Sequence, residues 1–218
     1  MTDARQVRMG AGDYSLVLPG TWAAIPLADE TVMKKSIAAL VKRQLGGDDR
    51  IARRRIQLRN ELVETAEKAV AEGALSFSLS MELLPGVPFP AAMMGKRRPW
   101  PEVAVVSAGA PQHERLAAAF PGATVLPLDS GDWMARIATS ETQRYVEQTT
   151  PSLTVEYWIE APDSDLLYLT ISAPMVPEAE LFVELFDLIA ASLTWDIDVA
   201  RSVIAVEDGL GEERPDVR

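Results

Sequence analysis

The sequence of 218 residues contains no cysteine and only one histidine, His113. Without thiols the chain cannot form a disulfide, use a thiolate nucleophile or bind zinc through sulfur. A single histidine excludes a metal site with two histidine ligands from one chain, and a serine–histidine–aspartate triad would have to use His113. The lack of cysteine also fits a reducing compartment, so we expect a cytoplasmic protein.

Long apolar runs are missing as well. No uninterrupted apolar stretch approaches the ~20 residues that a membrane-spanning helix needs, so we predict no transmembrane segment. Met1–Gly10 contains two arginines with no apolar stretch behind them, so we predict no secretory leader. Since 48% of the residues are hydrophobic and 24% are charged, the composition is that of a folded protein with a sizeable core.

Several common enzyme motifs are absent. Gly10–Gly12 supplies a GxG, but no strand precedes it and no third glycine follows, and the chain has neither a GxxxxGK(S/T) phosphate loop nor a GxSxG nucleophile elbow. Carboxylates are then the only side chains left as plausible catalytic groups. The pairs Asp129/Asp132 and Asp163/Asp165 could hold Mg²⁺ or Ca²⁺. Aspartate is also a preferred turn former, so we predict turns, and no metal or cofactor.

The charge is unevenly distributed along the chain. The formal net charge is −11, yet residues 31–98 hold 13 Lys/Arg against 7 Asp/Glu, whereas residues 99–218 hold 6 against 21. A globally acidic protein binds nucleic acid poorly, because that affinity comes from neutralised phosphates, so we expect no nucleic-acid partner. The asymmetry leaves two alternatives: a local anion-binding face, or basic helices that fold onto the acidic half and are partly neutralised there.

Two helices are predicted in the basic region. Asp29 can cap a helix that continues to about Leu45, and a second, two-faced helix spans about Arg50 to Glu72. Arg55 projects into the apolar stripe of the second helix, so either its stem lies along the core or its head pairs with a buried acid. The apolar stripe is formed by Ile51, Leu58, Leu62, Ala66 and Ala69, and is widened by Ile56, Val63 and Val70.

Alternating apolar residues predict several strands, and the closing order of a β-hairpin followed by a helix favours an α+β fold. Leu75–Leu83 alternates most cleanly, which predicts one buried face and one wet face. We predict one domain over residues 1–200, an antiparallel β-sheet flanked by helices, and a loose acidic tail over 201–218. The other predicted segments are strands at Tyr14–Leu18, Val103–Val106, Val125–Leu128, Trp133–Thr139, Thr154–Glu160, Leu167–Ile171 and Val199–Val206, helices at Pro111–Phe120 and Pro177–Leu193, and a loop at Pro85–Pro101.

Both ends of the predicted domain resemble a known family. A strand leading into Leu18–Trp22 (LPGTW), a closing β-hairpin and a final helix ending in Ala190–Trp195 (AASLTW) resemble the PsbP-like superfamily. That superfamily includes the extrinsic photosystem PsbP subunits, the Ran-binding Mog family and many bacterial proteins. The resemblance implies an α/β/α sandwich around an antiparallel sheet and a non-catalytic role in binding or assembly. It supplies no shared catalytic residue.

Two segments stand out as candidate contact surfaces. One is a basic cluster formed by Lys42, Arg43, Arg50, Arg53, Arg54, Arg55 and Arg59, which exceeds what solubility needs in an acidic chain. The other is the predicted loop Phe89–Trp100, which joins adaptable methionines to three basic residues; it could instead cover one end of the core, or touch an anionic membrane. The predicted partner-binding residues are Arg50, Arg53, Arg54, Arg59, Phe89, Met93, Met94, Lys96, Arg97, Arg98 and Trp100.

These observations predict a non-enzymatic protein-binding, assembly or adaptor module with an acidic protein partner. The alternative, from a different class, is a protein that binds a small ligand between the sheet and its helices, or hydrolyses a substrate there with carboxylates. Homo-oligomerisation through opposite charged faces is a further prediction. The lone His113, beside Glu114 in the first turn of a short helix, is expected to be a surface or capping residue.

Overall fold

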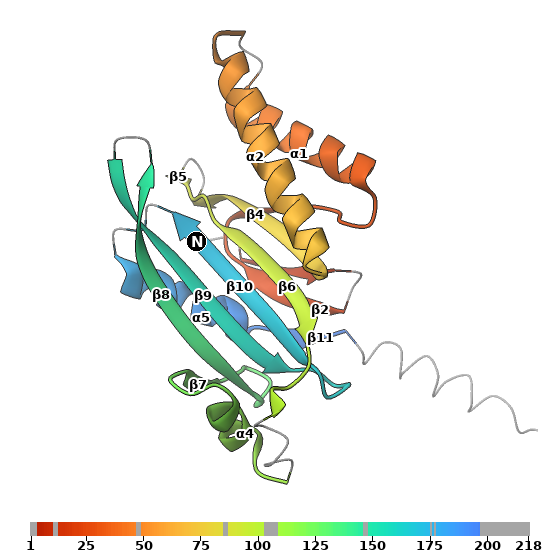
Figure 1. Cartoon of the computed structure of the whole chain (residues 1–218), viewed down its shortest axis with the longest axis vertical. Coiled ribbons are helices and arrows are strands. Elements are labelled where there is room, and N and C mark those ends of the chain that lie inside the picture. The colour runs from red at the N-terminus through yellow and green to blue at the C-terminus, as the bar shows by residue number, and fades with distance from the viewer. Residues whose placement is uncertain are drawn as a thin grey trace, which may run out of the picture.

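The computed structural model describes residues 4–10, 13–46, 49–84, 87–102, 109–145, 148–174, 176 and 178–196. Within these ranges the protein is α+β, as predicted: two antiparallel sheets and four α-helices (Figure 1). The predicted strand Val103–Val106, the predicted edge strand Val199–Val206 and the acidic tail over 201–218 lie outside the described residues.

The larger sheet has eight strands in the order β3-β4-β6-β10-β9-β8-β7, with β5 paired to β4. The smaller sheet has the order β1-β2-β11. The strands are β1 (Arg5–Met9), β2 (Tyr14–Leu18), β3 (Thr21–Ala24), β4 (Ala74–Leu84), β5 (Val87–Pro88), β6 (Ala92–Arg98), β7 (Thr124–Pro127), β8 (Trp133–Tyr145), β9 (Gln148–Glu160), β10 (Leu166–Pro174) and β11 (Thr194–Trp195).

Helices cover both faces of the larger sheet. On one face, α5 and the small sheet bury the main core, which includes Tyr157, Leu169 and Phe186. On the other face, α1 and α2 cover β3, β4 and β6 around a second core, and α4 closes a third cluster beside Leu166. The helices are α1 (Glu30–Leu45), α2 (Ala52–Ala71), α4 (Gln112–Ala119) and α5 (Ala179–Ala191), with a 3₁₀ turn η1 (Asp49–Ile51) before α2.

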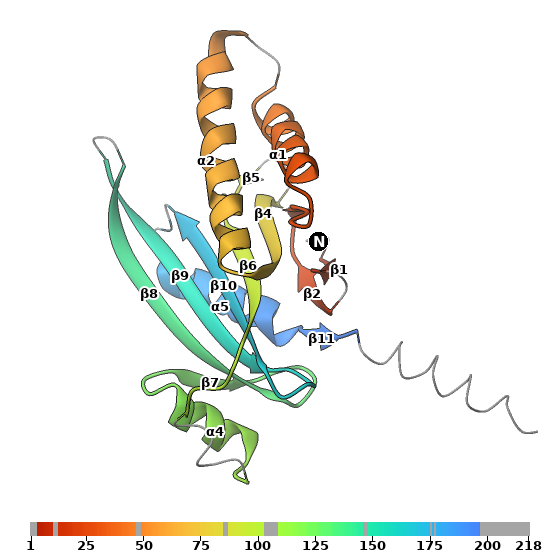
Figure 2. The ribbon, with the colours of Figure 1, turned by 45° about the vertical axis from the view of Figure 1, so that its right-hand side comes forward.

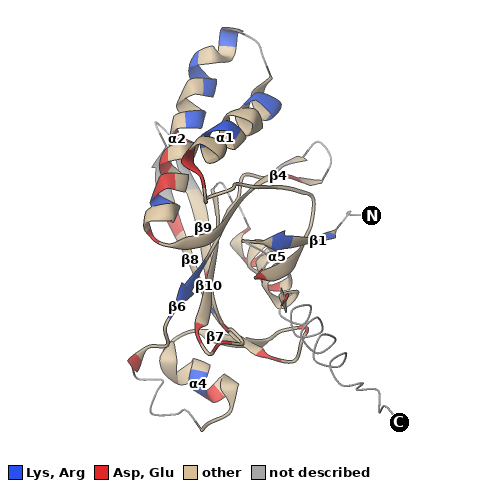
Figure 3. Ribbon diagram, turned by 90° about the vertical axis from the view of Figure 1, so that its right-hand side faces the viewer, with Lys and Arg blue, Asp and Glu red and all other residues tan. Residues whose placement is uncertain are grey.

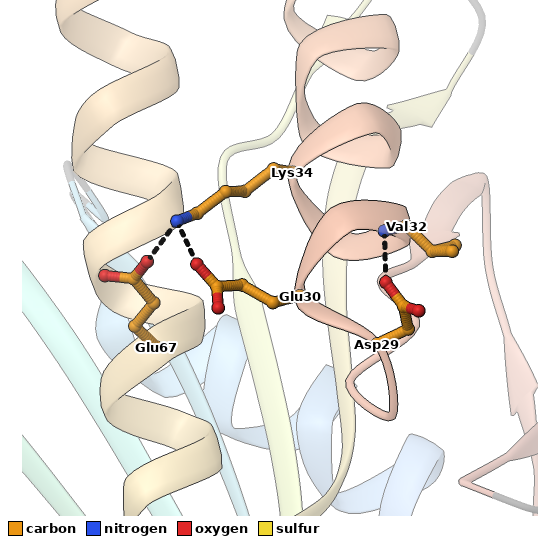
Figure 4. Close-up of polar contacts among 5 residues, drawn as sticks. All are labelled: Asp29, Glu30, Val32, Lys34 and Glu67. Atoms are coloured by element: carbon orange, nitrogen blue, oxygen red, sulfur yellow. Dashed lines mark hydrogen bonds and ion pairs between the residues drawn. The ribbon is translucent and has the colours of Figure 1, made fainter.

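Helices α1 and α2 form a hairpin that extends away from the sheet at its loop end (Figure 2). Asp29 begins α1, because its carboxylate accepts the Val32 N–H at 2.9 Å, as predicted (Figure 4). The apolar side of α1 is buried along the helix, whereas α2 completely buries only Ala66 and Ala69, both in its second half. The first half of α2 therefore lies beyond the part of the sheet that the hairpin covers.

The small sheet packs on the large one through a close approach at Gly95. The Tyr14 hydroxyl lies 2.7 Å from the Ser76 hydroxyl, and both are buried. A Cβ at Gly95 would stand 2.2 Å from the Tyr14 oxygen, so only glycine leaves room for this contact. Gly20 has a similar role in the predicted Pro19–Gly20 turn, where φ is +70° and a Cβ would meet the Glu82 carbonyl oxygen at 2.0 Å.

Two sequence predictions were wrong. The segment Pro85–Pro101 is not a long loop, since residues 92–98 form β6 in the interior of the large sheet, between β4 and β10. The strand Leu75–Leu83 exists as β4, but its serine face is not wet, because Ser76, Ser78 and Ser80 are all buried on the side of the main core. The second sheet covers that side, and a single strand pattern carries no information about such a distant neighbour.

Candidate functional site

The basic cluster lies at the loop end of the α1–α2 hairpin. We call its exposed members the basic tip, since they come from the last turn of α1, the 3₁₀ turn and the first half of α2. Figure 3 shows basic residues along this half of the hairpin and acidic residues along the half next to the sheet. The basic tip comprises Lys42, Arg43, Arg50, Arg53, Arg54 and Arg59.

Acidic residues of the hairpin are engaged near its base. Lys34 of α1 bridges Glu30 and Glu67, the latter at 2.9 Å, which ties the two helices together (Figure 4). Lys68 pairs with Glu64 within α2 at 2.8 Å. These ion pairs of the hairpin involve Lys34 and Lys68, and none of them involves Arg53, Arg54 or Arg59.

The described carboxylates of the later, acidic half of the chain form no ion pair with Arg53, Arg54 or Arg59 either. Four of them pair with arginines elsewhere: Asp163 with Arg97, Glu160 with Arg115, Asp187 with Arg136 and Asp196 with Arg8. Across the described residues, no ion pair involves Arg53, Arg54 or Arg59. The sequence left open whether the basic residues are neutralised within the chain. At these three positions the positive charge instead faces outwards.

Arg55, which the helical pattern placed in the apolar stripe, holds the hairpin together. Its guanidinium donates to the Gly46 carbonyl oxygen at 3.1 Å, immediately after the last turn of α1. A cation is favoured there because the carbonyl end of a helix carries partial negative charge. Arg55 therefore helps to fix the loop end of α1 beside α2, which positions Arg53 and Arg54.

The predicted contact residues of Phe89–Trp100 do not join the basic tip. Met93 is fully buried, Phe89 stacks on Phe182 of α5 with ring centroids 5.1 Å apart, and Met94 packs beneath α1 and α2. These three side chains cover the core, which was one of the alternatives for this segment. They are not available as a contact surface in this fold.

The basic and aromatic residues at the end of β6 lie near the base of the hairpin. Lys96 is buried and donates to Glu72 at 2.6 Å, while Arg97 pairs with Asp163 and lies over the Trp195 ring. Arg98 is exposed, and Trp100 lies half-buried against the Arg115 guanidinium. Since Glu72 follows Arg53 by 19 residues, at ~1.5 Å each, Glu72 and its partner Lys96 lie about 28 Å from Arg53 along α2.

A pocket of about 300 Å³ opens where β6 ends. Sequence reasoning missed its aromatic walls, although a signal was present. Trp158 and Tyr168 fall on the outward side of strands whose other side carries Tyr157 and Leu169, and large aromatic rings on a supposedly wet face suggest a covered or binding surface. The pocket is lined by Lys96, Arg98, Pro99, Pro101, Phe120, Trp158, Leu166 and Tyr168.

The aspartate pairs behave as turn residues. Asp163 accepts from the Asp165 N–H at 3.4 Å and pairs with Arg97, and Asp132 is bonded to Ser130 in the other turn. Within the described ranges no three histidine, cysteine or carboxylate side chains are grouped to hold a metal ion. His113 is exposed at the start of α4 and lies 5.2 Å from the Trp133 ring centroid.

Comparison with known proteins does not assign a family. No protein-family model matches the chain, and no curated protein matches it. The described helices include none that is both long and apolar enough to cross a membrane.

Proposed function

We propose that this protein is a non-enzymatic binding or assembly module whose basic tip docks onto an acidic surface of a partner protein. The observation that carries the proposal is the exposure of Arg53, Arg54 and Arg59, which form no ion pair with any described residue. They lie in the first half of α2, beyond the part of the sheet that the hairpin covers. The sequence resemblance to PsbP-like proteins and a cytoplasmic location are parts of the same proposal.

Arginine is well suited to this role. Its guanidinium binds a carboxylate through two parallel hydrogen bonds, and arginine is enriched at protein interfaces and among their strongest contacts. Ile56 lies among these arginines and is 53% exposed, so the tip also offers an apolar contact. An interface of this kind combines charge-steered approach with some apolar burial.

The charge of the whole protein favours a protein partner over other polyanions. With a net charge of −11, the molecule also has acidic surface, which an extended polyanion such as nucleic acid or an anionic membrane would approach together with the basic tip. A compact acidic patch on a protein requires only local charge complementarity, because charges further away than about 8 Å are screened at physiological ionic strength. The basic tip is small enough to satisfy that condition.

Affinity capture with a matched control tests the proposal. The full chain is immobilised and exposed to an extract of its source cells, beside Arg53→Glu/Arg54→Glu and the control Arg5→Glu/Lys35→Glu. Each double variant reverses two exposed charges and so changes the net charge from −11 to −15. We expect a protein that the wild type and the control retain, that added salt releases, and that the tip variant does not retain. Circular dichroism should show the same fold for all three proteins.

Equal retention by the tip variant and the control would contradict the proposal. Direct mixing with vesicles containing phosphatidylserine and with a DNA duplex provides the other arms of the test. If either polyanion bound the wild type through the basic tip more tightly than the captured protein, a protein-docking role would be excluded in favour of that ligand.

A further inference from the structure

The pocket at the end of β6 lies on the face of the large sheet that α1 and α2 share with α4. Leu166, which is fully buried, lies at its inner side, and Phe120 reaches it from the end of α4. Pro99 and Pro101 line it where the chain leaves β6. Most of its lining is therefore flat or stiff, since proline has a fixed φ and aromatic rings have few rotamers.

The aromatic wall is held in place by ring contacts. Phe120 stacks on Trp158 with centroids 4.5 Å apart and planes 24° from parallel, and Trp158 contacts Tyr168 at 5.5 Å. Tyr168 and Trp158 are direct partners across β10 and β9, and the Tyr168 hydroxyl donates to Glu156. Burial, above all, raises the pKa of Tyr168, so the phenol stays neutral. Such a wall is formed before any ligand arrives, which lowers the entropic cost of binding.

The charges around the pocket differ in how well they are compensated. Lys96 is neutralised by Glu72 at 2.6 Å and lies over the Tyr168 ring at 5.1 Å. The hydrogen bond from Lys96 lowers the pKa of Glu72, which keeps that carboxylate ionised. Arg98 is exposed and forms no ion pair with any described residue. Among the lining residues, only Arg98 thus offers a charge that is not held in an ion pair.

We infer that this pocket binds a small planar aromatic molecule that carries one negative group, with its rings against Trp158 and Tyr168 and its anion on Arg98. The size agrees, because a cavity of about 150 Å³ accepts one benzene ring and about 300 Å³ has room for two fused rings. A single arginine outside any ion pair matches one carboxylate or sulfonate rather than a polyphosphate. Glu72, which pairs with the pocket residue Lys96, lies about 28 Å from Arg53 along α2, so the pocket is separate from the arginines of the proposed docking.

Calorimetric titration with 2-naphthoate tests the inference on the full chain. We expect one binding site on the wild type, and at least tenfold weaker binding to Arg98→Gln, since a charge-assisted hydrogen bond contributes about that factor. Arg54→Gln removes the same charge at the basic tip and should bind 2-naphthoate like the wild type. The neutral 2-naphthamide should bind more weakly to the wild type and equally to Arg98→Gln.

The wall is tested with Trp158→Leu, whose thermal unfolding is followed to show that it still folds. We expect this variant to lose 2-naphthoate and 2-naphthamide alike. An absence of 2-naphthoate binding to the wild type would overturn the inference, as would equal binding to the wild type and Arg98→Gln. Either failure leaves the proposed docking untouched, because Arg53→Glu/Arg54→Glu tests that surface alone.

Discussion

Substitution of Gly95 by alanine should destabilise the protein at the junction of its two sheets. The new Cβ would lie 2.2 Å from the Tyr14 hydroxyl oxygen and 2.9 Å from the Ser76 oxygen, whereas ordinary van der Waals contact begins near 3.4 Å. The Tyr14 hydroxyl must therefore move by more than an ångström. It belongs to a fully buried side chain in the main core, so the displacement also affects its neighbours.

The magnitude follows from three opposing effects. Overpacking of a core costs about 1–3 kcal/mol, and breaking the buried Tyr14–Ser76 hydrogen bond costs about 1–3 kcal/mol more. Alanine in place of glycine inside a strand returns about 0.5–1 kcal/mol. We therefore expect Gly95→Ala to lower the free energy of unfolding by about 3 kcal/mol, measured from the shift of the urea midpoint. Gly109→Ala, whose Cβ meets nothing within 4 Å, should change it by less than about 0.5 kcal/mol.

A double variant isolates the clash between the new Cβ and the Tyr14 oxygen. Tyr14→Phe removes the oxygen that lies 2.2 Å from the new Cβ and leaves the ring carbon at 3.3 Å. The Ser76 hydroxyl at 2.9 Å remains, but it loses its Tyr14 partner and can rotate away, so Gly95→Ala should cost less in that background than in the wild type. The two substitutions should thus deviate from additivity by about 2 kcal/mol in the stabilising direction. Additive costs, or a Gly95→Ala protein as stable as the wild type, would refute this account of how the sheets pack.

Two further predictions concern buried polar groups. Asp187 of α5 accepts a hydrogen bond from the Tyr157 hydroxyl at 2.9 Å and pairs with Arg136. Asp187→Ala should therefore lower the free energy of unfolding in urea by about 3 kcal/mol, whereas Glu184→Ala, at an exposed position, should lower it by less than about 0.5 kcal/mol. Similar small costs for both variants would show that this network does not hold α5 on the sheet. Burial raises the pKa of Tyr14 to about 12. Because the unfolded chain loses that proton first, the contribution of Tyr14 to stability should be fully present below pH 10 and fall by about 2–3 kcal/mol between pH 10 and pH 12. Burial also raises the pKa of Tyr157 and of Tyr168, so Tyr14→Phe should reduce the total loss over this range without removing it; an unchanged slope in that variant would contradict the assignment.

The sequence predicted those elements whose signals are local. The Asp29 cap and the apolar spacing of α1 are set by residues within a few turns, as are the alternation and tight turn of the β9–β10 hairpin. The α+β class followed from their order. What could not be predicted depended on distant neighbours: β6 reads as a loop because of the prolines on both sides of it and its own basic residues, yet β4 and β10 pair with both of its edges.

The same difference between local signals and distant neighbours applies to the candidate sites. The basic tip could be located because residues close together in the sequence carry it, although only the fold shows that no described carboxylate of the later half pairs with Arg53 or Arg54. The pocket could not be located, because β9, β10 and the end of α4 contribute one or two residues each, far in the sequence from the four at the end of β6. Met93 was assigned to a surface because a methionine pair beside arginines resembles an adaptable loop, whereas the pleat of β6 turns it into the main core.

Site-specific photo-crosslinking in the source cells tests the central claim most directly. A photo-reactive amino acid replaces Gln57, which is exposed one turn after Arg53 and Arg54, and as a control replaces Leu188, which is exposed on α5. We expect position 57, and not position 188, to crosslink to a protein through a segment rich in aspartate and glutamate, and this crosslink to disappear in Arg53→Glu/Arg54→Glu. A crosslink at position 57 that persists in this variant, or none beyond the control, would contradict the account.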